Sequence, residues 1–331
     1  MWQLITFLIG YIGGSVLSNL LKRPDRGSFD FRAVIRSAER AEKIKAFGVT
    51  PIVGSHSDRE LMFKAASEAD IVITMADCDD LDAAQAILDG LKKRYEVTNK
   101  RSILIHTRRL SGSSVRDRYA PEYAPMVIMS QMPCSVIANL IDNTSGDHLS
   151  DVVYDDENAE QIEGLPPTNP HRHVDTVIVA AGQEGYVLTY LVVPSTIYGP
   201  ARNELVDAGI SSPEELFSKL YVPIALQHGN GFKLGEGKNV WPNIEINEVV
   251  DIYARLFNAV LQDPVNTPNG REGYYFGNSD HYKLADVYKT LAQVFYELGK
   301  GKSPEPTELT KEELDQFFGV GVFSKSTVYY F

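Results

Sequence analysis

The sequence predicts an α/β fold, a doubly wound parallel sheet covered by helices on both faces, with a smaller C-terminal lobe. Short, almost entirely apolar segments alternate with amphipathic stretches of helical length through residue 107. Such apolar runs are typical of strands buried on both faces, and parallel strands need helical crossovers. A glycine-rich stretch, GYIGG at 10–14, directly follows the first run. Right-handed crossovers place such a turn at the carboxyl edge of the sheet.

The expected strands of the first half are its apolar runs, and the expected helices lie between them. The strands are residues 4–9, 31–35, 49–53, 71–75 and 103–107. The helices are one that follows GYIGG, with Val16, Leu17, Leu20 and Leu21 on one side, one at 38–47 that Gly48 closes, and one at 80–97.

The second half begins with an interruption of this pattern. Residues 108–150 contain several arginines and prolines and a Met-rich stretch but no clear period, so we interpret them as an atypical insertion. Thr310 and Glu313 have the spacing of a capping box. The elements expected beyond the insertion are helices at 156–163, 170–184, 247–262 and 310–318, and a strand at 188–193.

These elements suggest two parts of unequal size. We expect a main domain at 1–193 and a smaller lobe formed mainly by 194–331. A strand at 239–246 and the helix at 247–262 are expected to return to the main domain.

Composition limits the class of protein and its partners. The chain has 331 residues, of which 44 % are hydrophobic and 23 % charged, as is usual for a soluble globular protein. A net charge of −12 argues against nucleic acid as a partner. The two cysteines form no CxxC pair, and no His/Cys cluster has zinc-ligand spacing. We therefore expect a cytoplasmic protein with no disulfide framework and no metal site.

The uncharged N-terminus allows a second interpretation. Residues 1–21 are long enough to span a membrane. Polar residues such as Gln3, Ser15 and Asn19 dilute the run, however, and no basic segment precedes it. We favour a buried strand and helix, and expect no membrane partner.

Seven segments of the chain carry a family resemblance. In order they are GYIGG (10–14), VIRSAERAEKIKAFGVTPIVGSHSD (34–58), ADIVI (69–73), ILIHT (103–107), PSTIYGP (194–200), WPNIEINEVVDIY (241–253) and REGYYFG (271–277). Together they resemble the atypical extended short-chain dehydrogenase/reductases, most closely fungal NAD(P)-binding proteins of the NAD-dependent epimerase/dehydratase type, and more distantly NmrA-type regulators. This resemblance implies a Rossmann fold, with NAD(P) bound by the main domain at 1–193 and the substrate bound mainly by the lobe at 194–331.

The resemblance implies a GxxGxxG turn that binds the dinucleotide diphosphate, with backbone from Phe7 through Tyr11 and Ile12 to Gly13. Gly10 and Gly13 stand at its second and third glycines, and Phe7 stands at the first. A phenylalanine enters positive φ only at a cost of roughly 1–2 kcal/mol, so we expect weakened cofactor binding. If Gly10 is instead the first glycine, this expectation does not hold. GYIGG could also simply pack a helix on a strand.

Cofactor preference is inferred from the end of the second strand. NAD-binding relatives have an acidic residue there, whereas this chain has Arg36. A guanidinium suits the 2′-phosphate of NADP, so NADP is preferred and NAD possible. A solvated surface arginine is the alternative. By resemblance Asp58 lies beside the adenine, although it could equally be an ordinary helix N-cap.

The catalytic pattern departs from the family. Typical members use a Ser or Thr after the fifth strand and a Tyr-x-x-x-Lys pair on the helix before the sixth. Thr107 could supply the hydroxyl, whereas His171 stands at the Tyr position and Asp175 at the Lys position. His171 could transfer a proton, with Asp175 one turn away to orient it. A charged, solvated first helical turn is an equally good interpretation, and a His171/His173 metal pair is less favoured. The chain's Tyr296–Lys300 pair follows the sixth strand and is topologically misplaced.

These features together predict a function. By resemblance, Pro194 and Ser195 lie beneath the nicotinamide ring. We expect an NADP-preferring oxidoreductase that acts on a small carbonyl, aldehyde or sugar-derived substrate, as a monomer or homodimer. The alternative is a non-catalytic NAD(P)-binding sensor, favoured by the missing Tyr and Lys.

Overall fold

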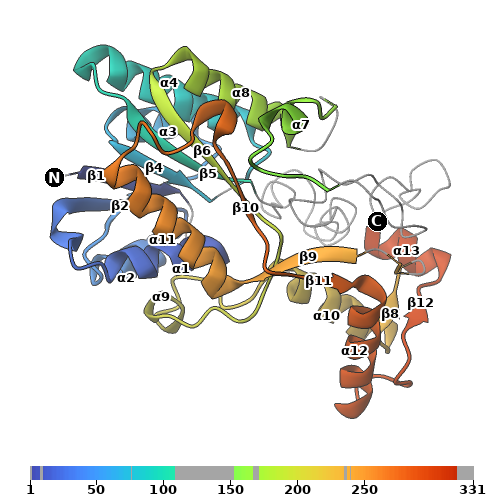
Figure 1. Cartoon of the computed structure of the whole chain (residues 1–331). Helices are drawn as coiled ribbons and strands as arrows, with labels where there is room; N and C mark the ends of the chain where they lie inside the picture. Colours follow the sequence, from blue (N-terminus) through green and yellow to red (C-terminus); the bar gives the residue numbers. More distant parts are fainter. Residues whose placement is uncertain are drawn as a thin grey trace.

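The computed structural model describes most of the chain (Figure 1). The described residues are 2–7, 10–75, 77–108, 153–166, 171–234, 237–238 and 240–318, without the side chains of 4–7, 216, 217, 220 and 318. The predicted insertion, apart from Arg108, therefore lies outside the described residues.

A seven-stranded sheet forms the centre of the molecule, in the order β10-β6-β5-β4-β1-β2-β3. Every neighbouring pair of strands in it is parallel. The strands are β1 (Trp2–Phe7), β2 (Phe29–Ile35), β3 (Thr50–Val53), β4 (Ile71–Thr74), β5 (Ser102–Thr107), β6 (Val187–Pro194) and β10 (Tyr274–Gly277). The predicted strands of the first half and the strand at 188–193 are confirmed to within two residues at each end.

Helices cover both faces of this sheet (Figure 1). One face carries α1 (Tyr11–Leu21), α2 (Ala38–Lys45) and α11 (Ile246–Gln262). The other carries α3 (Arg59–Ser67), α4 (Leu81–Thr98) and α8 (Arg172–Glu184). Two separate hydrophobic cores fill these interfaces. This arrangement confirms the predicted doubly wound α/β fold.

The side chains of β5 alternate between the two cores. Ile103 and Ile105 belong to the core shared with α1 and α11, whereas Leu104 belongs to the core shared with α4 and α8. Because successive strand residues point to opposite faces, His106 lies on the α4/α8 face and Thr107 on the α1/α11 face. This alternation determines which of the predicted site residues lie on the same face of the sheet.

The remaining elements lie around the main sheet and in the C-terminal lobe. The strand predicted at 239–246 is β9 (Val240–Glu245), which pairs with β7 (Thr196–Tyr198) and β11 (Asp280–Lys283) in a separate three-stranded sheet. A two-stranded sheet joins β8 (Phe232–Lys233) to β12 (Thr307–Glu308). The other helices of the described residues are α7 (Ala159–Glu163), α9 (Glu204–Asp207), α10 (Leu216–His228), α12 (Leu284–Glu297), α13 (Lys311–Phe318) and the short 3-10 turns η1 (Arg26–Ser28) and η3 (Gly270–Glu272).

The lobe has its own small core and a capped final helix. The ring of Tyr221 stacks on that of Phe232, with centroids 4.4 Å apart. The amide of Glu313 donates to Thr310 Oγ1 at 3.1 Å, and the amide of Thr310 donates to Glu313 Oε2 at 2.8 Å. The predicted capping box is therefore confirmed.

The apolar N-terminus forms β1 and α1. In the part of the chain that the structure describes, no helix has both the length and the apolar character needed to span a bilayer.

Candidate active site

The predicted site residues follow the carboxyl ends of different strands. Gly10 comes after β1, Arg36 after β2, Thr107 ends β5, and Ser195 follows β6. Because the strands are parallel, these ends lie along one edge of the sheet. Ligands of open α/β sheets bind in the crevice outside this edge.

The start of α1 is suited to an anion. Gly10 is its N-cap, no side chain of the described residues caps it, and its first turn has no acidic residue. The Tyr11 hydroxyl donates to the carbonyl oxygen of Gly199 at 2.5 Å, and the Ser211 hydroxyl to that of Gly10 at 2.8 Å. Ile12 is fully buried in the core. Tyr11 and Ile12 can therefore offer a ligand only backbone amides, while the helix start is held in place by the segment 198–211.

The glycine turn itself is only partly described. Phe7 ends β1, in register with Val34 of β2 and Thr74 of β4. The side chain of Phe7 and residues 8–9 lie outside the described residues. The expected effect of Phe7 thus stays a prediction.

Arg36 and Asp58 differ in their side-chain contacts. Arg36 is exposed directly after β2, and its side chain makes no hydrogen bond or ion pair with the residues that the structure describes. Asp58 is the N-cap of α3, and its Oδ1 accepts from the Leu61 amide at 3.0 Å. Arg36 is consequently available to a ligand, while Asp58 has a local role in starting its helix.

Ser195 has a buried hydroxyl with no hydrogen-bond partner among the residues that the structure describes. Its amide donates to the Gly277 carbonyl oxygen at 2.8 Å, which continues the pairing of Pro194 with Gly277. The residue is 3 % exposed, and its Oγ makes no hydrogen bond to any described residue. A buried polar group without a hydrogen bond costs about 1–3 kcal/mol. A ligand group at this edge would remove that cost.

The side chains of Thr107 and His171 are hydrogen-bonded to different neighbours. The Thr107 hydroxyl is hydrogen-bonded to the Tyr253 hydroxyl of α11, on the α1/α11 face. His171 begins α8, on the opposite face. The described residues include no hydrogen bond between the two.

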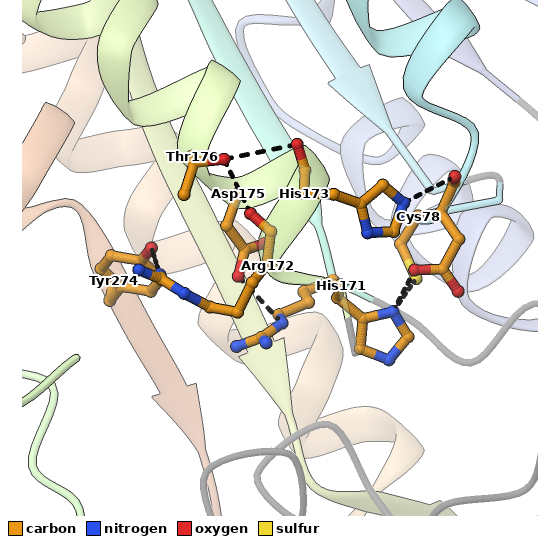
Figure 2. A network of polar contacts seen from close by, with 9 residues as sticks. Cys78, His171, Arg172, His173, Asp175, Thr176 and Tyr274 are labelled. Atoms are coloured by element: carbon orange, nitrogen blue, oxygen red, sulfur yellow. Dashed lines mark hydrogen bonds and ion pairs between the residues drawn. The ribbon is translucent and has the colours of Figure 1, made fainter. Parts of the chain in front are cut away.

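His171 is buried between α8 and the loop after β4 (Figure 2). It is the N-cap of α8, with a φ of 67°, in the left-handed region that non-glycine residues seldom adopt. Its Nδ1 is hydrogen-bonded to Asp79 Oδ1 and lies 3.4 Å from Cys78 Sγ. Its Nε2 is buried and makes no hydrogen bond to a described residue.

Asp175 does not orient His171 as the sequence suggested. Its Oδ2 lies 3.2 Å from Nε of Arg108, and both side chains are almost completely buried. Burial raises the pKa of Asp175, while Arg108, His171 and Arg172 act in the opposite direction. Asp79, rather than Asp175, makes the hydrogen bond to the His171 ring. Asp175 lies one turn further along α8, where it points to the end of β5 and pairs with Arg108.

The first turn of α8 is largely buried. His171 and Arg172 are 3 % and 7 % exposed, and Arg172 donates to the Tyr274 hydroxyl at 3.4 Å. The interpretation of this segment as a charged, solvated first turn therefore does not hold for His171, Arg172 and Asp175, which are all buried. Only His173 is exposed, and its Nε2 lies 3.1 Å from the Asp79 carbonyl oxygen.

Sequence reasoning missed three residues of this site, namely Cys78, Asp79 and Arg108. Arg108 immediately follows β5, and the other two follow β4. Their place just beyond parallel strands is the signal that could have identified them.

We predict that the buried imidazole of His106 makes the fold sensitive to acid. Its Nδ1 lies 2.6 Å from Thr74 Oγ1. Burial lowers the pKa of His106 from 6.5 to about 4, with Arg108 and His171 acting in the same direction and Asp79 against it. The folded state therefore binds this proton less readily than the unfolded state, and the associated stability is lost as the pH falls from 6.5 towards 4.

The free energy of unfolding of the parent protein should fall between about pH 7.5 and about pH 5. In His106→Asn we expect this fall to be smaller by about 2 kcal/mol. Urea unfolding at both pH values measures this difference. His281→Asn, at an exposed histidine of β11, should keep the parental pH dependence. An identical pH dependence in the His106 variant would contradict a neutral buried imidazole.

Comparisons with known proteins agree with this fold. The family model of the NmrA-like family matches residues 5–152. The oxidase ucsJ of an Acremonium species is 26 % identical over 294 residues, which cover 86 % of this chain and 75 % of the oxidase.

Two solved structures of bacterial enzymes share the architecture. A dTDP-glucose 4,6-dehydratase of Streptomyces venezuelae, with NAD bound, is 15 % identical with a TM-score of 0.56, covering 96 % of this chain and 91 % of that one. A UDP-glucose 4-epimerase of Thermotoga maritima is 11 % identical with a TM-score of 0.55, covering 94 % and 87 %. The Rossmann fold and the resemblance inferred from the sequence are both confirmed.

Proposed function

We propose that this chain, a Rossmann-fold protein resembling the extended short-chain dehydrogenase/reductases and NmrA-like proteins, is an NAD(P)-dependent oxidoreductase. One observation carries the proposal. Among the described residues, the start of α1 has no side-chain cap and the Ser195 hydroxyl has no hydrogen-bond partner, and both lie with the buried His171 at the carboxyl edge of one parallel sheet. The NmrA-like match and the NAD named for the dehydratase support the same conclusion.

The residues at this edge fit a dinucleotide. The amides that begin α1 at Gly10 would hold its diphosphate, because helix N-termini carry unpaired N–H groups and a partial positive charge. Arg36 would bind the 2′-phosphate of NADP, and the buried Ser195 hydroxyl would bond the nicotinamide end. When bound, the nicotinamide ring supplies or accepts a hydride.

His171 is our candidate for moving the proton. In the reducing direction its Nε2–H would donate to the substrate oxygen, while Asp79 at Nδ1 holds the ring in place. The polarising role predicted for Thr107 would require its hydroxyl to turn from Tyr253.

The proposed substrate is a small carbonyl compound, an aldehyde or a sugar derivative. The nucleotide sugars named for the dehydratase and the epimerase favour the last class. Titration of the purified protein with NADPH and NADH, followed by a panel of these carbonyl classes, tests the proposal. Binding with turnover supports it, binding without turnover favours the sensor, and no binding of either nucleotide rejects it.

Arg36→Ala should weaken NADPH binding selectively. Loss of one charge-assisted contact to the 2′-phosphate costs on the order of 1.5–3 kcal/mol, roughly ten- to a hundred-fold in affinity. NADH lacks that phosphate, so its affinity should hardly change. Fluorescence titration with both nucleotides measures the two constants.

Arg255→Ala provides the matched control, since it removes another exposed arginine, on α11. It should leave both affinities unchanged. Equal losses for NADPH and NADH in Arg36→Ala would reject a role in nucleotide preference, and no loss for either would make Arg36 an ordinary surface residue.

A further inference from the structure

Three potential metal ligands converge at the buried start of α8. Cys78 and Asp79 come from the loop after β4, and His171 comes from α8, more than ninety residues later. The Cys78 Sγ, the His171 Nδ1 and a carboxylate oxygen of Asp79 all lie within 4.8 Å of one another. Cys78 is 1 % and His171 3 % exposed, whereas the Asp79 side chain is 40 % exposed. Two of the three ligand residues are thus buried, and the third, Asp79, is partly exposed to solvent.

The three side chains meet at one ring nitrogen. Nδ1 of His171 lies 3.4 Å from Cys78 Sγ (Figure 2), and it is also hydrogen-bonded to Asp79 Oδ1. Without a metal, a single Nδ1–H can be shared between the carboxylate and the weakly accepting sulfur. A cation among the three groups would instead use the lone pair of Nδ1, the thiolate and the carboxylate together.

The ligand set and its spacing suit Zn²⁺. Zinc binds cysteine, histidine and carboxylate ligands tetrahedrally, and its usual bond lengths place a sulfur and a nitrogen ligand about 3.5 Å apart. The observed distance from Cys78 Sγ to His171 Nδ1 is 3.4 Å. Asp79 would have to move outward from Nδ1, which its partial exposure permits.

The exposed neighbour of the cluster is His173. Its Nε2 lies 3.1 Å from the Asp79 carbonyl oxygen, so it touches the backbone of one ligand residue and none of the three ligand atoms. Three protein ligands leave a fourth tetrahedral position for water, as in open zinc sites.

We propose that Cys78, Asp79 and His171 bind one divalent transition-metal ion of the zinc class. The ion would be bound as Zn²⁺ by a thiolate, a carboxylate and a neutral imidazole, so the thiol proton is released to solvent and the imidazole carries its single proton on Nε2. This site goes beyond the proposed oxidoreductase function and does not depend on it.

Co²⁺ titration of the full chain tests the site directly, because cobalt replaces zinc and absorbs visibly when bound to thiolate. We expect one Co²⁺ per chain, a sulfur charge-transfer band, and loss of both signals on addition of Zn²⁺. Cys78→Ala should abolish the band and weaken binding by at least about a hundred-fold, more than loss of an outer-shell partner costs. Asp79→Asn should weaken binding while keeping the band.

Two variants serve as controls. Cys134→Ser changes the chain's other cysteine, and His173→Ala removes the neighbouring histidine without removing a ligand. Both should retain the band and the stoichiometry, and thermal unfolding should confirm that all variants are folded. Absence of stoichiometric Co²⁺ binding, or a band that survives Cys78→Ala, would overturn the proposal.

A metal at this site would also affect the proposed reaction. An ion at Nδ1 would displace Asp79 from His171, so Zn²⁺ should lower turnover and a chelator should restore it. This part rests on the proposed function. NADPH titration of the same samples separates the two, because nucleotide binding at α1 needs no metal, and failure of one measurement leaves the other unaffected.

Discussion

Arg108→Leu is expected to lower the free energy of unfolding by about 3–5 kcal/mol, because it leaves Asp175 buried without its ion-pair partner. Arg108 is 0 % and Asp175 1 % exposed, with Nε and Oδ2 3.2 Å apart. Urea unfolding at neutral pH measures the loss. Lys92→Ala is the control, because the Lys92–Glu184 pair has side chains 51 % and 57 % exposed and should contribute far less.

The pH dependence tests whether this loss is electrostatic. Burial raises the pKa of Asp175 even beside Arg108, and removing the guanidinium should raise it further. The destabilisation should therefore shrink as the pH falls and the carboxyl takes up a proton.

A double variant separates charge from packing. Arg108→Leu with Asp175→Leu should recover most of the stability, since neither charge is then buried alone. A loss that is independent of pH and persists in the double variant would mean that packing by Arg108, not its charge, stabilises the fold.

The second large effect concerns turnover. His171→Ala should lower kcat by at least about a hundred-fold while leaving NADPH affinity nearly unchanged, because a positioned proton donor contributes mainly to the transition state. Steady-state kinetics on the best carbonyl substrate, together with nucleotide titration, measures both quantities.

The neighbours of His171 provide graded comparisons. Asp79→Asn should reduce kcat less than His171→Ala, since it keeps the ring but weakens its orientation. His173→Ala removes an exposed ring beside the same loop and should have little effect. Parental turnover in His171→Ala would remove the histidine from the mechanism.

Much of the fold was predictable because its determinants are local. The apolar runs at 31–35, 71–75 and 103–107 are long enough for strands and too short for helices, and β2, β4 and β5 lie there. The Thr310–Glu313 capping box spans a single helical turn, so its spacing in the sequence already specifies its geometry.

The candidate site was predictable only in outline. The carboxyl edge follows from parallel strands, so Gly10, Arg36 and Ser195 could be placed along it without coordinates. The hydrogen-bond partner of His171 could not be predicted in this way. Asp175 is four residues away and Asp79 is ninety-two, yet Asp79 makes the hydrogen bond.

The sequence by itself determined the alternation of strands and helices, the parallel sheet and the edge where a ligand would bind. Only the tertiary structure decided that His171 meets Cys78 and Asp79, that Asp175 pairs with Arg108, and that Thr107 faces α11. The reason is physical: strand and helix periods depend on neighbouring residues, whereas these contacts depend on how α8 packs on the sheet, which side chains from the whole core fix together.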